Sequence, residues 1–329
     1  MREEIFSVEF TEIDTYVKQH QRFLILGHVD PDGDCIGSML ALTLFLVSHG
    51  KNVMCYAPGQ IADGYMKLPG SDLFATVDDL HNFQYEVVFA LDSPTTARTA
   101  DIIKPGDSKP VINIDHHPTN EHYGRINVVD QNASATAVLI YRLLSAIANE
   151  GITTEMAACL YLGILLDTGG FRFQNTDAEA LATAAELIRL GAQPYDLAHE
   201  FIYMKSFNTL KLLARALKSL ELHCSGRVAF MSVSMKMVEE SGGSISDTEG
   251  FIDYASSIDN VELSALFREL RECEVRVSLR SRNDYNVAEL AEQYHGGGHR
   301  NAAGLMLHEN LETARSIILR ECKKLLKVH

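Results

Sequence analysis

Three apolar segments of this chain each lead directly into acidic or imidazole residues. The segments and the residues that follow them are 23–26 with His28, Asp32 and Asp34, 85–91 with Asp92, and 111–114 with Asp115, His116 and His117. Short apolar runs of this kind are typical of buried strands. The carboxyl ends of strands meet at one edge of an open α/β sheet, where binding sites form. These polar residues, far apart in sequence, are therefore expected to converge.

Helical patterns alternate with the predicted strands, among them 36–49, 154–166 and 177–190. This alternation predicts an α/β fold whose mostly parallel sheet has helices on both faces. At 329 residues the chain is longer than one typical core, so two domains are expected. We predict a first domain over 1–192, a helical linker over 193–222, and a smaller mixed α/β domain over 223–329.

The loop from Gly27 to Asp34 holds one imidazole and three carboxylates. Pro31 and Gly33 exclude regular structure there. Taken alone, the loop fits a solvated turn and a cation site equally well, because Asp, Pro and Gly are ordinary turn residues. Asp167, which follows the apolar run 160–166, adds a further carboxylate at the end of an apolar segment. Four such endings favour the cation site.

Composition excludes several classes of protein. Hydrophobic residues make up 46% and charged residues 22%, as in ordinary globular proteins, and no apolar run is long enough to span a bilayer. The first residues lack a secretory signal, and the six cysteines are scattered singly, so a reducing, cytoplasmic location is expected. A formal charge of -15 argues against binding long nucleic acid.

Five motifs in this order resemble those of the DHH phosphoesterase superfamily. They are His28-x-x-Pro31-Asp32-Gly33-Asp34, Asp92, Asp115-His116-His117, Asp167-Thr168-Gly169, and Gly296-Gly297-Gly298-His299 with Asn301-Ala302-Ala303-Gly304. The last of these resembles the associated DHHA1 domain. Chain length and layout are similar to the bacterial nanoRNase and pAp-phosphatase branch.

The resemblance implies a two-metal centre. Its six candidate ligands are His28, Asp32, Asp34, Asp92, His116 and Asp167. Nitrogen and oxygen ligands without thiolates suit Mn²⁺, with Mg²⁺ or Co²⁺ as alternatives. In the family pattern, His28 and Asp32 bind one ion, Asp34, His116 and Asp167 bind the other, and Asp92 bridges them.

Other residues near the motifs receive different interpretations. His117 is expected to contact the substrate or donate a proton, against the alternative that it only packs beside the site. Asp115 is expected to orient an imidazole, and Asp30 is a turn residue. Together with Asp92, His117 and Asp115 form the predicted catalytic set.

A cationic group near the C-terminus is the predicted counterpart of this acidic region. The predicted substrate-binding residues are Arg280, Ser281, Gly297, Gly298, His299 and Arg300. Residues 296–298 are expected to form a nest, a loop whose backbone N–H groups bind an anion. The alternative is a flexible turn beside solvated arginines. Arg280 and Arg282 alternate along a strand end, and Arg280 is the one expected to face the cleft between the domains, where we place the active site.

The predicted function is hydrolysis of short oligonucleotides such as pApA or pGpG, and of pAp, by a metal-dependent phosphoesterase. Phe171 and Phe173 are candidates for stacking on a base, and equally for the core. The alternatives are a family II inorganic pyrophosphatase or short-chain polyphosphatase, and a non-catalytic nucleotide-binding regulator. No membrane partner is expected, and a homodimer is left open.

Overall fold

A computed structural model describes residues 6–104, 108–148 and 151–328 of the chain. It divides into two compact units, Met1–Met204 and Lys205–His329, which are described separately below. The division falls within the segment 193–222 that was predicted as a linker. Within the described residues, no helix combines the length and apolar character needed to cross a membrane.

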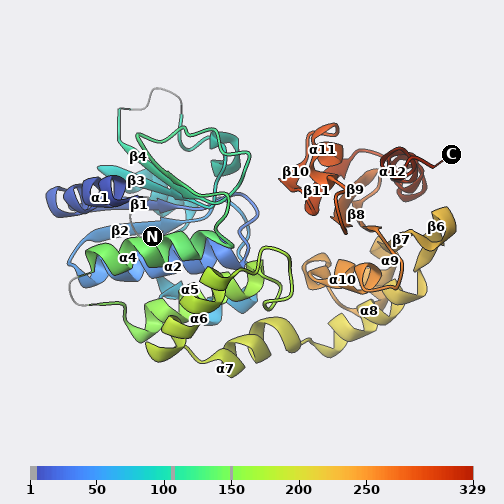
Figure 1. Cartoon of the computed structure of the whole chain (residues 1–329), viewed down its shortest axis with the longest axis horizontal. Coiled ribbons are helices and arrows are strands. Elements are labelled where there is room, and N and C mark those ends of the chain that lie inside the picture. The colour runs from blue at the N-terminus through green and yellow to red at the C-terminus, as the bar shows by residue number, and fades with distance from the viewer. Residues whose placement is uncertain (1–5, 105–107, 149–150, 329) are drawn as a thin grey trace. The chain divides into compact units, whose positions relative to one another are not determined.

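The first unit is built on a parallel sheet with the strand order β2-β1-β3-β4-β5 (Figure 1). The strands are β1 (Arg22–Leu26), β2 (Asn52–Tyr56), β3 (Val87–Leu91), β4 (Val111–Asp115) and β5 (Ile126–Val129). All residues of β3 and β4 are buried, as expected for inner strands covered on both faces. The predicted parallel α/β fold is confirmed; β5 was not predicted.

Helices surround this sheet and connect its strands. They are α1 (Ser7–Gln19), α2 (Gly33–Ser48), α3 (Val77–Asn82), α4 (Thr136–Ile147), α5 (Thr154–Asp167), α6 (Ala178–Arg189) and α7 (Pro194–Ala198), with short turns η1 (Asp63–Lys67), η2 (Ser71–Leu73), η3 (Thr96–Thr99) and η4 (His199–Tyr203). Along β1, Phe23 and Ile25 join the core that contains α1, α2, α4 and α5, whereas Leu24 and Leu26 join a smaller core with Leu80 of α3. Successive strand residues thus anchor opposite layers.

Two glycines let α2 and α5 approach each other closely. A Cβ added at Gly37 of α2 would lie 2.4 Å from the Cys159 carbonyl oxygen of α5. A Cβ added at Gly163 of α5 would lie 2.8 Å from the Ala137 Cβ and 3.0 Å from Asp34 Oδ1. Only glycine fits at such contacts. This close packing brings the first turn of α2 and the start of α4 against α5.

The second unit holds a six-stranded mixed sheet with the order β10-β11-β9-β8-β7-β6. The strands are β6 (Glu221–His223), β7 (Val228–Val233), β8 (Leu263–Arg271), β9 (Glu274–Ser281), β10 (Gly297–His299) and β11 (Ala302–Leu307). Only the β7–β8 pair is parallel among these neighbours. The helices are α8 (Phe207–Lys218), α9 (Met235–Ser241), α10 (Phe251–Ser256), α11 (Val287–Glu292) and α12 (Leu311–Leu326), with turns η5 (Cys224–Gly226) and η6 (Ile245–Thr248). One core packs α11 and α12 on the sheet, and another packs α8 and α10.

The glycine segment 296–298 differs from the expected nest. Gly297 and Gly298 belong to β10, which pairs with β11 at the edge of the sheet. A Cβ added at Gly296 would lie 2.2 Å from the Gly304 carbonyl oxygen. The glycines therefore allow two backbones to approach closely within a hairpin, and the backbone pairing of β10 replaces the loop that the composition suggested.

Replacing Gly37 by alanine should lower the free energy of unfolding. Alanine has the higher helix propensity by about 1 kcal/mol, but overpacking of a rigid contact costs about 1–3 kcal/mol. Urea denaturation of Gly37→Ala measures the balance. Gly64→Ala is the matched control, because an added Cβ there meets nothing within 4 Å. Equal stability of the two variants would contradict the assigned role of the close α2–α5 contact.

Candidate metal centre

The reversal of strand order in the first unit places two of the predicted residues together. The chain leaves β1 for β2 on one side and returns to β3 on the other side of β1. Loops that follow such a pair of strands separate and leave a crevice at their carboxyl ends. His28 follows β1 and Asp92 follows β3, and His28 Nε2 lies 3.5 Å from Asp92 Oδ2. Both side chains are buried.

Helix α2 starts within the acidic loop. The Asp32 side chain accepts hydrogen bonds from the backbone N–H groups of Asp34 and Cys35, at 3.0 and 3.1 Å, and so caps the helix. The expected lack of regular structure holds for residues 27–32 and was wrong for Gly33 and Asp34, because an N-cap aspartate starts a helix in spite of the glycine that follows. Asp34 consequently lies in the first helical turn.

Asp34 joins α2 to α4. Its carboxylate accepts hydrogen bonds from the backbone N–H groups of Thr136 and Ala137, at 2.6 and 2.8 Å. The N-cap residue of α4, Ala135, supplies no side-chain cap of its own, so Asp34 caps this helix from another element. The positive end of α4 favours a charged carboxylate there. Burial and the charge of Asp92 nevertheless raise the pKa of Asp34 well above its usual value.

Asp92 occupies the middle of the centre. It is a non-glycine residue with a left-handed backbone, φ 54°, and its Oδ1 accepts a 2.9 Å hydrogen bond from Thr136 Oγ1. Oδ1 also lies 3.7 Å from His116 Nε2 and 3.6 Å from His117 Nδ1. Burial alone would raise the pKa of Asp92, but the hydrogen bond from His28 and the charges of His117 and His116 hold it below its usual value.

His116 presents one ring nitrogen to three carboxylates. Its Nδ1 donates to the Ala133 carbonyl oxygen at 3.1 Å, which leaves the lone pair on Nε2. That Nε2 lies 3.8 Å from Asp34 Oδ2, 3.7 Å from Asp92 Oδ1 and 3.9 Å from Asp167 Oδ2. These separations are too long for hydrogen bonds. They suit atoms that share a cation, since bonds of about 2.0–2.2 Å place neighbouring ligand atoms about 3–3.6 Å apart.

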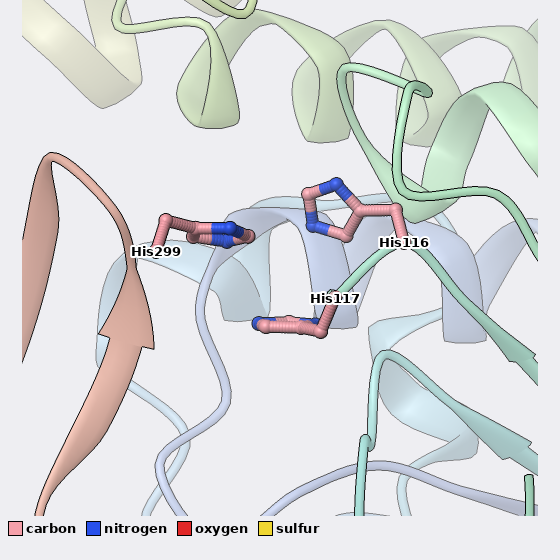
Figure 2. A group of neighbouring side chains, drawn as sticks. All are labelled: His116, His117 and His299. Atoms are coloured by element: carbon pink, nitrogen blue, oxygen red, sulfur yellow. The ribbon is translucent and has the colours of Figure 1, made fainter. Parts of the chain in front are cut away.

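His117 is held by the first residue of the triplet. Figure 2 shows His116 and His117 on the segment that follows β4; their ring centroids are 4.9 Å apart and the rings are inclined by 69°. His117 Nδ1 donates to Asp115 Oδ1 at 2.7 Å, and Asn120 donates to Asp115 Oδ2 at 2.6 Å. Burial lowers the pKa of His117, but the bond to Asp115 and the charge of Asp92 raise it to about 9.

Asn175 fixes the position of Asp167, the last residue of α5. The Asn175 Nδ2 atom lies 3.1 Å from Asp167 Oδ2, 3.0 Å from the Asp167 carbonyl oxygen and 3.0 Å from the Ser134 carbonyl oxygen. One amide thus links the end of α5 to the segment before α4. Sequence reasoning missed Asn175, because an asparagine eight residues from the motif carries no local signal.

Phe171 and Phe173, the two candidates for stacking on a base, follow Asp167 and lie in different surroundings. Gly169, Gly170 and Phe171 all have positive φ angles, and the Phe171 ring packs at 63° to the Tyr161 ring at 6.1 Å. Phe171 thereby belongs to the first core. Phe173 is exposed, and its ring lies beside Gly169.

His28 fits a metal ligand less directly than His116. Its Nδ1 accepts hydrogen bonds from the Arg98 guanidinium at 3.0 Å and from the Asp30 backbone N–H at 3.3 Å. Both partners are donors, so the proton of the neutral ring sits on Nε2, which faces Asp92. Coordination through Nε2 requires this proton to move to Nδ1 and Arg98 to turn away. Arg98 was not predicted.

Three clusters of candidate ligands form in the first unit. They are Asp34 with Asp92 and His116, Asp92 with Asp115 and His117, and His28 with Cys35 and Asp92. The donor chemistry of the first cluster, two buried carboxylates and an imidazole with a fixed tautomer, fits Mn²⁺ or Mg²⁺. Asp32 caps α2 and joins none of the clusters that the described residues of this unit form.

The predicted substrate-binding residues lie in the second unit. Ala302 of β11 pairs with Arg280 of β9 on one side and with His299 of β10 on the other. Directly opposed residues project from the same face of a sheet, so Arg280 and His299 share a face. Arg282, beyond the strand end, donates to the Ser256 carbonyl oxygen at 2.7 Å.

Two other predicted residues of this unit have local partners. Ser281 Oγ donates to the Tyr285 carbonyl oxygen at 2.6 Å, and Asn301 donates to Ser281 Oγ at 2.9 Å. Exposed Arg300 donates to the Asp284 carbonyl oxygen at 2.8 Å. These contacts give both residues a role in shaping the loops around β10.

Loss of the Asn175 amide should weaken metal binding. Asn175→Ala removes one hydrogen bond to the Asp167 carboxylate, and removing such an outer hydrogen-bond partner costs about 10–100-fold in metal affinity. Calorimetric titration of Mn²⁺ into the metal-free protein measures this change. Asn132→Ala is the control, since that exposed amide donates only to Asp130. Unchanged affinity in Asn175→Ala would contradict a role for Asp167 in the centre.

The chain matches two domain families and several known proteins. Residues 22–164 match the DHH family N-terminal domain, and residues 228–324 match the DHHA1 domain. A protein of Thermus thermophilus named bifunctional oligoribonuclease and PAP phosphatase is 32% identical, over 86% of this chain and 83% of the relative. A protein of the same name from Bacillus subtilis is 28% identical, over 97% of this chain and 99% of the relative.

A solved structure is similar over nearly the whole length. The exopolyphosphatase-related protein of Bacteroides fragilis superimposes with a TM-score of 0.90 at 28% identity, covering 97% of both chains. The resemblance noted in the motifs is therefore confirmed. The chain belongs to the DHH family and joins its N-terminal domain to a DHHA1 domain.

Proposed function

We propose that this chain is a two-metal phosphoesterase that hydrolyses short oligonucleotides to mononucleotides and pAp to AMP. The observation that carries the proposal is the convergence of Asp34, Asp92 and His116, with Asp167 beside them, in one buried cluster. The names of the relatives support oligonucleotides and pAp as substrates. A cytoplasmic location stays a prediction from the sequence, and a homodimer stays open.

The proposed ligands divide between two positions around Asp92. Asp34, His116 and Asp167 would hold one divalent ion, and His28 and Asp32 the other, with Asp92 shared; Mn²⁺ is the proposed metal. Two such ions, when bound, supply positive charge that neutralises phosphoryl oxygens and makes an attacking water more acidic. For Asp32, the only support for this assignment is its position at the start of α2. His28 can bind an ion through Nε2 only in the tautomer described above.

His117 is proposed to act on the substrate directly. With its pKa raised to about 9, the ring carries a proton at neutral pH in the metal-free chain. Asp115 orients it and Asn120 orients Asp115. Through the ring N–H that does not bind Asp115, the protonated ring can donate to a phosphoryl oxygen or to the leaving oxygen. The packing alternative is weakened because His117 lies 3.6 Å from Asp92 Oδ1.

The DHHA1 domain is proposed to bind a substrate phosphate or base. Arg280 and His299 share one face of its sheet and supply a cation and an imidazole. Gly297 and Gly298 precede His299 in β10, Ser281 follows Arg280 in β9, and Arg300 follows His299. That both domains act on one substrate, with the active site in a cleft between them, stays a prediction.

The substrate proposal is tested with a panel of pApA, pGpG, pAp, pyrophosphate and tripolyphosphate in the presence of Mn²⁺. Cleavage of the dinucleotides and pAp is expected. Polyphosphate is the second candidate, favoured by the likeness to an exopolyphosphatase-related protein. Release of phosphate from pyrophosphate or tripolyphosphate alone would overturn the preferred function.

Asp92→Asn should abolish hydrolysis in a folded protein. If this variant still binds dinucleotide, that alone does not support the regulator alternative. That alternative would be supported only if the wild type is inactive as well.

Arg280→Ala should raise KM for pApA far more than for a small chromogenic phosphodiester. The reason is that the larger substrate loses a charge-assisted contact that the small one never makes. Arg271→Ala is the control, because this exposed arginine of the same sheet pairs only locally with Glu274. Equal changes in KM for the two substrates would count against a substrate-binding role for Arg280.

A further inference from the structure

A buried thiol lies beside two of the proposed metal ligands. Cys35 is fully buried in the first turn of α2, and it forms a cluster with His28 and Asp92. One ligand atom from each residue lies within 4.8 Å of the other two. The sequence suggested only a small packing residue at this position, because nothing local distinguishes Cys35 from the other scattered cysteines.

We propose that His28, Cys35 and Asp92 form a binding site for a thiophilic divalent cation such as Zn²⁺ or Cd²⁺. The site shares two residues with the proposed catalytic centre but differs from it in donor chemistry. Thiolate, imidazole and carboxylate together match the ligands that Zn²⁺ prefers, and three protein ligands with one open position form a common zinc arrangement. Hard cations such as Mn²⁺ gain little from the sulfur.

The surroundings of Cys35 keep its sulfur close to this position. A Cβ added at Gly27 would lie 2.7 Å from Cys35 Sγ, so the end of β1 packs tightly against the thiol. On the helix side, Sγ lies 3.8 Å from Met39 Sδ. The sulfur also has a hydrogen bond with the His28 backbone, so it is held at the residue that supplies the imidazole of the proposed site. Ligand atoms would have to close by about 1 Å to reach tetrahedral separations.

Binding replaces a proton by a metal ion. The thiol Cys35 Sγ–H loses its proton to solvent as the sulfur–metal bond forms, so one proton is released per ion bound. Cation binding and loss of the thiol proton are thereby linked, because the thiolate is the form of cysteine that binds a metal.

The other cysteines provide the comparison. Cys55 is also buried, within β2, and Cys159 Sγ lies 3.6 Å from the Pro69 carbonyl oxygen. Of the cysteines that the structure describes, only Cys35 joins a cluster of candidate ligands. Cys224 and Cys273 are partly or fully exposed, so they can bind Cd²⁺ weakly and must be removed from the background.

Cadmium titration of the full-length, metal-free protein tests the site. The parent carries Cys224→Ser and Cys273→Ser, and ultraviolet absorption reports the cadmium–thiolate bond. The parent should develop this band with one equivalent of Cd²⁺, and Cys35→Ser should lose it. Loss of a direct ligand should weaken Cd²⁺ binding by more than the ~10–100-fold that an outer partner costs. Cys55→Ser, the matched buried control, should keep the band.

Two outcomes would overturn the proposal. One is a parent without the band, and the other is a band that survives in folded Cys35→Ser, as verified by circular dichroism. Cys35→Ala serves as a second variant if the serine form does not fold. Excess Mn²⁺ should suppress the band, because both ions need His28 and Asp92. The readout is spectroscopic, so failure of the proposed hydrolysis leaves the result unaffected, and failure here leaves the proposed function standing.

Discussion

The Asp34 carboxylate is the interaction on which the rest of the first unit depends. It belongs to α2, caps α4 through two backbone N–H groups, and lies against Gly163 of α5. Three helices thus meet at one buried anion. Burying a carboxylate is costly unless hydrogen bonds or opposite charges compensate. The end of α4 supplies part of that compensation, and a divalent cation shared with His116 would supply the remainder.

The same requirement explains the buried polar groups around the centre. Asp92 takes a hydrogen bond from Thr136 while lying near three imidazoles, and Asp115 takes bonds from His117 and Asn120. Each carboxylate therefore has a partner that fixes its direction. Ligands that are held before the ion arrives lose less conformational freedom on binding. The thiol of Cys35 lies beside this set, in the cluster that we propose as a site for a thiophilic cation.

The sequence predicted the residues that end strands better than those that support them. His28, Asp92 and the triplet Asp115–His117 were placed correctly at one edge of the sheet, because parallel strands bring their carboxyl ends together whatever their distance in sequence. Thr136, Asn175 and Arg98 were missed, since each comes from a segment whose local pattern reads as an ordinary helix or turn. Their contacts exist only after the helices have packed.

Glycine caused the errors in secondary structure. Gly33 was read as a breaker, although Asp32 caps the helix that begins there. Gly297 was read as part of an anion-binding nest, with a flexible turn as the alternative, although it pairs in an edge strand. In both places glycine permits close backbone contact, and only the folded partner, Leu166 beside Gly33 or the strand β11 beside Gly297, shows which structure results.

The most direct test of this account is the dependence of stability on Mn²⁺. Urea unfolding of the metal-free protein, repeated at rising free Mn²⁺, should show a free energy of unfolding that increases with the logarithm of concentration. Two ions bound to the folded state alone give about 2.7 kcal/mol per tenfold increase at saturation, and one ion gives about 1.4 kcal/mol. A slope near the higher value is predicted. Stability that does not change with Mn²⁺ would contradict a metal centre built on Asp34 and Asp92.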